Sequence, residues 1–187
     1  AQHVFSQRGY HATSISDIVH KAGVARGTFY QYFDGKKAIF LVLLNALIDE
    51  LMNSIVGVDQ SPHAPPLNHQ LIETVRRIFA VVKRKRAITT IVFREAVGLD
   101  DDVENLLKAF YGNLQQYIIA ALTVGESVGA IRELDREVVA NCIVGSLRQV
   151  AQNYLVDHPD RLFDPQHIAT EVVKLHLSGV LSTPRVQ

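Results

Sequence analysis

The sequence predicts an all-α fold, in which a small three-helix unit at the N-terminus precedes a larger helical body. Apolar residues recur every three or four positions along nearly the whole chain, which is the period of an α-helix. The alternation of apolar and polar residues that marks a half-buried strand is absent. Glycine and helix-capping residues divide the periodic pattern into separate helices.

The composition is that of an ordinary globular protein and limits its class. The chain has 187 residues, 48% of them hydrophobic and 20% charged, which suits one or two small domains. The nearest candidate for a membrane span, Ala38 to Leu44, is far shorter than the ~18 residues required. The single cysteine excludes an internal disulfide and fits a reducing cytoplasm. No signal peptide is visible, and the chain opens inside a helix whose start we expect to lie upstream.

The N-terminal part predicts two short helices joined by a turn, after the end of a preceding helix. That first helix ends at Gly9, where a left-handed C-cap is expected. Ser14 and Asp17 have the spacing of a capping box at the start of the second helix, which ends at Gly23. A third helix lies within "ARGTFYQYF", residues 25–33. Short helices joined by a glycine-containing turn have the layout of a helix-turn-helix.

The first domain is expected to end at residue 40, and residues 41–187 are predicted to form the helical body. A long helix is expected over residues 36–56, and its part from Ile39 to Leu44 is apolar on nearly every side, so both faces must be covered there. "GVDQSPHAPP" is the clear loop. The remaining helices are expected at 67–84, at 88–97 with Gly98 as a stop, at 101–124, at 135–156 and at 165–181.

Charge is distributed unevenly along the chain. The formal net charge is zero, which by itself argues against binding to nucleic acid. Residues 1–40, however, carry five basic and two acidic side chains, whereas the remainder carries 14 basic and 17 acidic ones. A mildly basic N-terminal unit on an acidic body is compatible with DNA binding.

The stretch "FSQRGYHATSISDIVHKAGVARGTFYQYFDGKKAIF" closely resembles the DNA-binding domain of the TetR family of bacterial transcriptional regulators. The matching residues are Phe5, Gly9, Tyr10, Thr13, Ser14, Ile15, Asp17, Ile18, Ala22, Gly23, Val24, Arg26, Gly27, Thr28, Tyr30, Phe33 and Lys36. The sequence departs from the family at Ala25, where many members carry a Ser or Thr that caps the recognition helix or touches a phosphate. Beyond residue 55 the resemblance is one of architecture.

The resemblance implies that the helix-turn-helix binds operator DNA. Arg26 opens the recognition helix, and its guanidinium matches the O6 and N7 acceptors of guanine. Tyr30 and Tyr32 can donate hydrogen bonds to phosphates, Gln31 can reach either adenine or the backbone, and Lys36 matches the family's phosphate-contacting lysine. The full set of expected DNA-binding residues is Thr13, Ser14, Arg26, Gly27, Thr28, Tyr30, Gln31, Tyr32 and Lys36.

The body is implied to bind a small effector and to dimerise. The helices have few charges, which favours a hydrophobic or aromatic effector, and the last two helices are expected to pair with their copies so that the dimer matches a palindromic operator. The expected effector-binding residues are Phe93, Arg94, Phe110, Asn113, Leu114, Tyr117, Cys142 and Gln149, although Cys142 favours a buried, unreactive thiol. The resulting prediction is a ligand-responsive repressor; the alternative is an architectural or protein-partner DNA-binding factor without an effector.

Signatures of enzymes and cofactor sites are missing from the sequence. It contains no HExxH, GxSxG, P-loop or GxGxxG motif, and its serines and eight histidines show no nucleophile–base or metal-ligand spacing. The run "KRKR", Lys83 to Arg86, is interpreted as a solvated helix end. We therefore expect no enzyme activity, no cofactor, no metal and no membrane partner.

Overall fold

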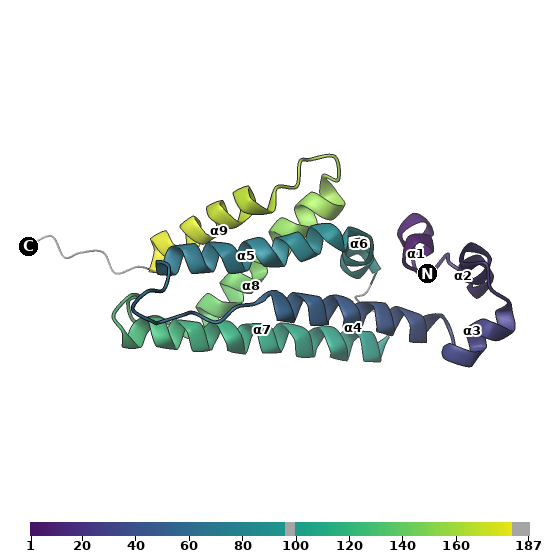
Figure 1. Cartoon of the computed structure of the whole chain (residues 1–187), viewed down its shortest axis with the longest axis horizontal. Helices are drawn as coiled ribbons and strands as arrows, with labels where there is room; N and C mark the ends of the chain where they lie inside the picture. The colour runs from purple at the N-terminus through teal and green to yellow at the C-terminus, as the bar shows by residue number, and fades with distance from the viewer. Residues whose placement is uncertain (96–99, 181–187) are drawn as a thin grey trace, which may run out of the picture.

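The computed structural model describes residues 1–95 and 100–180, and every regular element in these two ranges is helical (Figure 1), which confirms the all-α prediction. The N-terminal unit contains α1 (Gln2–Arg8), α2 (Ile15–Ala22) and α3 (Arg26–Tyr32). The body contains α4 (Lys36–Ser54), α5 (Leu67–Arg84), α6 (Arg86–Glu95), α7 (Asp101–Ser127), α8 (Arg136–Gln152), the π-helical turn η1 (Asn153–Asp157) and α9 (Pro165–Val180).

The helix boundaries follow the sequence pattern closely. Helix α5 begins and ends where it was expected, whereas α4 stops slightly early, at Ser54, and α7 continues to Ser127. Helix α8 ends at Gln152 because the backbone widens there into the π-helical turn, which apolar periodicity does not distinguish from α-helix. The expected helix ends at Gly98 and Leu181 lie outside the described residues.

The capping box at the start of α2 is confirmed. The Asp17 amide donates to Ser14 Oγ at 3.1 Å, and the Ser14 amide donates to Asp17 Oδ2 at 2.9 Å. Hydrogen bonds from Ser14, together with the nearby Arg8 guanidinium, hold the pKa of Asp17 below its usual value. Gly23 ends α2 in the left-handed conformation, with φ 68° and ψ 28°. The capping box therefore fixes the start of α2, and the left-handed Gly23 fixes its end and the turn towards α3.

Gly9 differs from the expected left-handed cap. Its φ is 80°, which favours glycine, but its ψ is 163°, so the chain leaves α1 in an extended direction. A Cβ at this position would lie 2.7 Å from Glu95 Oε1 of α6. The prediction of a left-handed cap was wrong because a contact with α6, distant in sequence, sets this turn.

An aromatic cluster joins the N-terminal unit to α4. The Phe5 ring lies 5.5 Å from the Tyr10 ring and 6.0 Å, edge to face, from the Phe40 ring. Phe40 also packs on Tyr10, with 5.0 Å between ring centroids. Since Phe40 belongs to α4, the first turns of this long helix complete the core of the N-terminal unit. Helix α4 thus crosses the division at residue 40, which stays a prediction.

The body extends away from the N-terminal unit along α4. Figure 1 shows α1, α2 and α3 at one end, and α4 running beside α7 into the body. Helix α5 packs along α9, α7 packs against α8, and α1 packs against α6. The largest fully buried side chains of the body are Leu44, Phe79, Ile88, Val103 and Leu155. Helix α6 therefore lies where the body meets the DNA-binding unit.

The basic run begins at the end of α5, where Lys83 and Arg84 are exposed as its interpretation as a solvated helix end implies, and three of its residues also contact other segments. Glu50 of α4 forms ion pairs with Arg84, at 2.6 Å, and with Lys85. Arg86 Nη2 donates to the Pro159 carbonyl oxygen at 2.8 Å. These contacts tie the junction of α5 and α6 to α4 and to the loop before α9.

We expect Ser14→Ala to lower the free energy of unfolding by about 1 kcal/mol, because the Asp17 amide loses its capping partner. Ser14→Thr keeps a hydroxyl and is the matched control, with a much smaller loss. Urea denaturation followed by circular dichroism measures both values. Equal stability of the Ala variant and the wild type would contradict a stabilising role for the capping box.

Candidate nucleic-acid interface and ligand cavity

Helix α3 exposes one polar face and buries one aromatic side chain. Phe29 is buried and packs on Phe33, with 5.5 Å between ring centroids. The expected DNA-facing residues of this helix are all exposed: Arg26, Gly27, Thr28, Tyr30, Gln31 and Tyr32. Tyr32 is 76% exposed, an unusual position for so large a ring in a molecule without a partner. The helix therefore presents a compact set of donors and rings outward.

Arg26 and Tyr30 lie one turn apart and contact each other. The Arg26 guanidinium lies 5.8 Å from the centre of the Tyr30 ring, and Arg26 Nη2 lies 3.5 Å from Tyr30 Oη. This contact orients the guanidinium along the outer surface of α3. Ala25, the N-cap residue, gives no side-chain cap, as its sequence departure implied.

Thr13 and Ser14 use their hydroxyls inside the protein. Thr13 is 2% exposed and donates to the Gly9 carbonyl oxygen at 2.6 Å. Ser14 Oγ donates to Asp17 Oδ2 at 2.6 Å as part of the capping box. Both side chains position the turn before α2, and neither hydroxyl is free for a phosphate in this arrangement.

Lys36 also acts within the protein. Its ammonium donates to the carbonyl oxygens of Tyr10, His11 and Thr13 at 2.6, 3.1 and 2.9 Å, and it lies 4.4 Å from the centre of the Tyr10 ring. Three carbonyls match the three donors of an ammonium group. Lys36, at the start of α4, therefore holds the turn between α1 and α2 by binding the backbone carbonyl groups of that turn.

Glu95, at the end of α6, holds the same turn by binding backbone amide groups of that turn. Glu95 Oε2 accepts hydrogen bonds from the Tyr10 amide at 2.6 Å and from the His11 amide at 3.4 Å. The turn is thus bound by a cation on α4 and an anion on α6. We call this arrangement of Lys36, Glu95 and residues 10–13 the turn clamp. Sequence reasoning missed Glu95, because nothing local links it to a turn 85 positions away.

An ion pair beside the turn clamp joins α4 to α7. Lys37 Nζ lies 2.7 Å from Asp100 Oδ1 and 2.5 Å from Asp102 Oδ2. Hydrogen bonds to these two carboxylates raise the pKa of Lys37, and the Lys37 ammonium lowers the pKa of Asp100. Asp100 also caps α7 by accepting from the Asp102 amide at 2.9 Å. Glu95 and Asp100, the described residues on either side of 96–99, therefore both contact the DNA-binding end.

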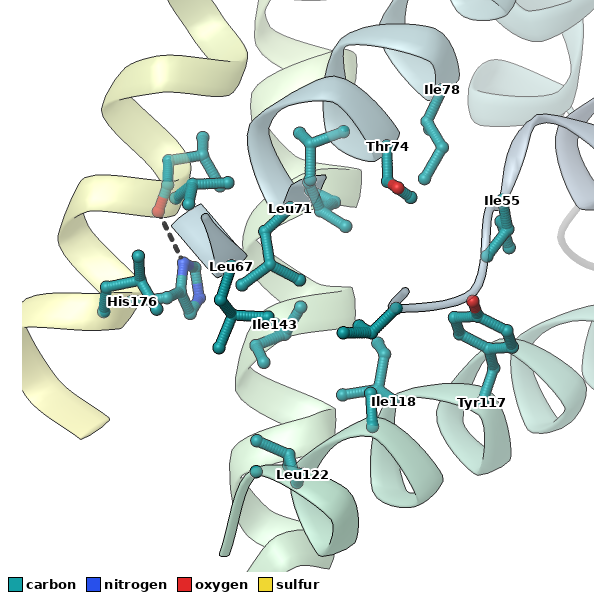
Figure 2. Close-up of a pocket in the computed structure, with 18 of the residues that line it drawn as sticks. Ile55, Leu67, Leu71, Thr74, Ile78, Tyr117, Ile118, Leu122, Ile143 and His176 are labelled. Atoms are coloured by element: carbon teal, nitrogen blue, oxygen red, sulfur yellow. Dashed lines mark hydrogen bonds between the residues drawn. The ribbon is translucent and has the colours of Figure 1, made fainter. Parts of the chain in front are cut away.

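Two apolar pockets lie inside the body. The first, which we call the apolar cavity, has a volume of about 160 Å³ and lies between α5, α7, α8 and α9 (Figure 2). The second, of about 90 Å³, lies between α4, α5, α6, α7 and α8. Both pockets are lined by Ile55, Ile78, Leu114 and Leu147, so these side chains separate them. Movement of these side chains would join the pockets into one channel.

The expected effector-binding residues divide into two groups. Phe93 and Phe110 line the second pocket, Tyr117 lines the apolar cavity, and Leu114 lines both. The others line neither of these two pockets: Arg94, Asn113, Cys142 and Gln149. Cys142 is exposed, so the expected buried thiol was wrong; it faces away from the core on α8.

The polar groups in the pockets are few, and most were not expected. Thr74, Tyr117 and His176 line the apolar cavity, and Thr89, Tyr111 and Arg148 line the second pocket. Apolar periodicity treats threonine, histidine and arginine as interruptions, so sequence alone could not select Thr74, Thr89, Arg148 and His176.

His176 is the polar group at the α9 side of the apolar cavity, and it contacts a serine. Its Nδ1 lies 2.8 Å from the Val172 carbonyl oxygen, which can only accept, and its Nε2 lies 3.2 Å from Ser146 Oγ. Ser146 Oγ also donates to the Ile143 carbonyl oxygen at 2.9 Å. Sequence reasoning missed this serine–histidine pair, because the two residues lie on different helices, 30 positions apart.

The described residues contain no group of three or more His, Cys, Asp or Glu side chains placed to hold a metal ion. Within the same residues, no helix combines the length and the apolar character that a membrane crossing requires.

The chain is similar to known regulators in sequence and in structure. Residues 1–43 match the family model described as bacterial regulatory proteins, tetR family. The HTH-type transcriptional regulator YdgC of Bacillus subtilis is 28% identical over 184 residues, covering 97% of this chain and 89% of that protein. The HTH-type transcriptional repressor BepR of Brucella suis is 26% identical over 188 residues, covering 98% and 85%. The structure of the regulator FadR from Bacillus subtilis in complex with stearoyl-CoA superposes with a TM-score of 0.76 at 21% identity, covering 96% and 95%.

We expect Glu95→Ala to increase the hydrogen-exchange rates of the Tyr10 and His11 amides about tenfold or more, because both lose a charged acceptor. Glu95→Gln keeps an acceptor oxygen and should change them much less. Hydrogen–deuterium exchange followed by NMR measures these rates, with the amide of buried Ala169 as an internal reference. Unchanged exchange at residues 10 and 11 in the Ala variant would contradict the turn clamp.

Proposed function

Because the chain belongs to the TetR family of bacterial regulatory proteins, we propose that it is a DNA-binding transcriptional repressor that acts as a dimer and is released by an apolar effector. The observation that carries the DNA-binding part is the outward face of α3. This helix is held by a capped neighbour and a buried Phe29, and it presents Arg26, Thr28 and Gln31 where base edges are read.

The phosphate contacts are assigned to exposed residues of the same face. Tyr30 and Tyr32 have exposed rings and hydroxyls that can donate to phosphate oxygens. Thr13, Ser14 and Lys36 are left out of this contact set, because their polar groups already bind the protein. A phosphate contact by Lys36 stays a prediction, since it would require the ammonium to exchange a carbonyl partner for DNA.

The proposed dimer uses α8 and α9. Each of these helices exposes a large apolar side chain on the single chain: Val138 is 56% exposed and Leu175 is 70% exposed. Exposed apolar surface of this kind is typical of a protein–protein interface. A two-fold dimer through these helices presents two copies of α3 to one palindromic site.

The proposed effector is an apolar molecule that binds in the body. The linings of both pockets are almost entirely aliphatic or aromatic, which favours an effector over the alternative of a factor without one. At about 160 Å³ the apolar cavity takes a benzene-sized group, so a longer ligand must join the two pockets. The stearoyl-CoA held by the Bacillus subtilis FadR structure suggests a long acyl chain as the class to test.

The effector is proposed to act through α4 and α6. The second pocket is lined by Leu44, Leu47 and Leu51 of α4 and by Val92 and Phe93 of α6. These two helices also carry the two sides of the turn clamp, Lys36 and Glu95. A ligand that separates them would therefore strain the clamp and displace α1 and α2. Effector and operator then oppose each other through one conformational equilibrium.

The DNA-binding function is tested by selecting sites from a pool of random duplexes and titrating the winner by fluorescence anisotropy. We expect a palindromic site whose affinity falls steeply as salt rises. Arg26→Ala should weaken binding to the selected duplex about tenfold or more, and binding to an unselected duplex much less. Lys108→Ala, which removes one positive charge from the body, is the control. Failure to enrich any sequence, with only weak salt-sensitive binding, would overturn the function.

A further inference from the structure

The apolar cavity borders a third space, which we call the polar recess after the residues that line it. This polar recess has a volume of about 370 Å³ and lies between α5 and the segment that follows α4. Its polar lining consists of Asp59, His69, Gln70, Glu73, Thr74 and Arg77. Thr74 lines both spaces, and Val56 and Gly57 of the recess follow Ile55 of the apolar cavity directly in the chain. The two spaces therefore meet at Thr74 and residues 55–57.

Two hydroxyl groups lie at this border. Tyr117 lines the apolar cavity, and its Oη would be 3.8 Å from a Cβ at Gly57, which lines the recess. Thr74 Oγ1 lies 3.5 Å from the Val56 carbonyl oxygen, at the long limit for a hydrogen bond. Figure 2 shows both side chains on the side of the cavity where Ile55 lies, with His176 on the opposite side.

The Tyr117 hydroxyl is a free donor in this part of the molecule. Among the residues that the structure describes, Tyr117 Oη has no hydrogen-bond partner, although the cavity around it is lined by aliphatic side chains. Burial raises the pKa of Tyr117, so the hydroxyl keeps its proton. No buried side-chain nitrogen or oxygen among the described residues lacks a partner, so the unbonded Tyr117 hydroxyl reaches solvent at the border of the recess, where a ligand carbonyl can replace water as its partner.

The recess opens to solvent, and the charged side chains beside it already have partners. Arg77, which lines the recess, and Arg76, which does not, both donate to Glu73 with bonds of 2.7 Å, and they lower the pKa of Glu73 to about 2. Asp59 accepts from the Ser61 amide at 2.8 Å. Neither arginine is therefore left to bind an anionic group, and a hydrophilic head in the recess keeps its contact with solvent.

We propose that Tyr117 and Thr74 form a carbonyl-binding subsite, and that the effector is an acyl amphiphile. Its carbonyl oxygen accepts hydrogen bonds from Tyr117 Oη and Thr74 Oγ1 at the border. Its acyl chain fills the apolar cavity and continues past Leu114 and Leu147 into the second pocket, and its hydrophilic head lies in the polar recess. This inference rests on the proposed function, because it requires that the body bind an apolar effector.

A tyrosine outside the three pockets serves as a matched control. Tyr154 of η1 is also a partly buried phenol, and its ring packs on the Phe163 ring with 5.5 Å between centroids. It lines neither of the two apolar pockets nor the polar recess. Tyr154→Phe therefore removes a hydroxyl of the same kind from the body without touching the proposed subsite.

The test measures binding of palmitoyl-CoA, free palmitate and 1-aminoanthracene to the full chain, with palmitoyl-CoA kept below its micelle concentration. We expect the wild type to bind palmitoyl-CoA more tightly than palmitate, because only the former has a head for the recess. Tyr117→Phe and Thr74→Val should each weaken palmitoyl-CoA binding about fivefold and leave 1-aminoanthracene, which has no carbonyl, unchanged. Tyr154→Phe should bind all three as the wild type does.

The outcomes separate this inference from the function on which it rests. Palmitoyl-CoA binding that is unchanged in Tyr117→Phe overturns the subsite. If the wild type binds palmitoyl-CoA no more tightly than palmitate, the recess does not bind the head. Binding of 1-aminoanthracene without palmitoyl-CoA overturns the acyl amphiphile and leaves an apolar effector standing. A wild-type chain that binds none of the three probes overturns the effector part of the proposed function, and this inference with it.

Discussion

The turn between α1 and α2 depends on two opposite charges brought from distant parts of the chain. Lys36 binds its carbonyl groups and Glu95 binds its amide groups, so the peptide at Tyr10 is held from both sides. Charged partners make hydrogen bonds that are stronger than those between neutral groups. The start of α2 follows this turn through the Ser14–Asp17 capping box, and α3 follows α2 through the turn at Gly23. The orientation of the recognition helix is therefore set partly by the body.

The same two charged residues stand at the ends of helices that line a pocket. Helices α4 and α6 enclose the second pocket near its middle and carry Lys36 and Glu95 near the DNA-binding unit. Small pockets in a closely packed interior cannot accept a long ligand without helix movement. A ligand too long for the pockets would thus move α4 and α6, and with them the two charged groups that bind the turn. The Lys37 ion pairs with Asp100 and Asp102 extend this link to α7.

Local signals made most of the fold predictable, whereas contacts between distant segments did not. The Ser14–Asp17 capping box and the cap at Gly23 follow from neighbouring residues, and both were expected from the sequence. Gly9 and Lys36 were assigned from local position, but in the structure Gly9 lies against Glu95 and Lys36 belongs to the turn clamp. Helical periodicity was enough to predict that Phe93, Phe110, Leu114 and Tyr117 line a pocket. It could not select Thr74 and His176, since only the packing of α5 and α9 brings these two residues to the cavity.

An occupied cavity is proposed to weaken operator binding through the turn clamp. The ratio of operator affinities without and with saturating palmitoyl-CoA, measured for the wild type, Glu95→Gln and Glu95→Ala, tests this coupling. A coupling of ordinary size gives a ratio of about 5 to 150 for the wild type. We expect a similar ratio for the Gln variant and a ratio close to one for the Ala variant. A ratio in Glu95→Ala equal to that of the wild type, or a wild-type ratio of one, would contradict it.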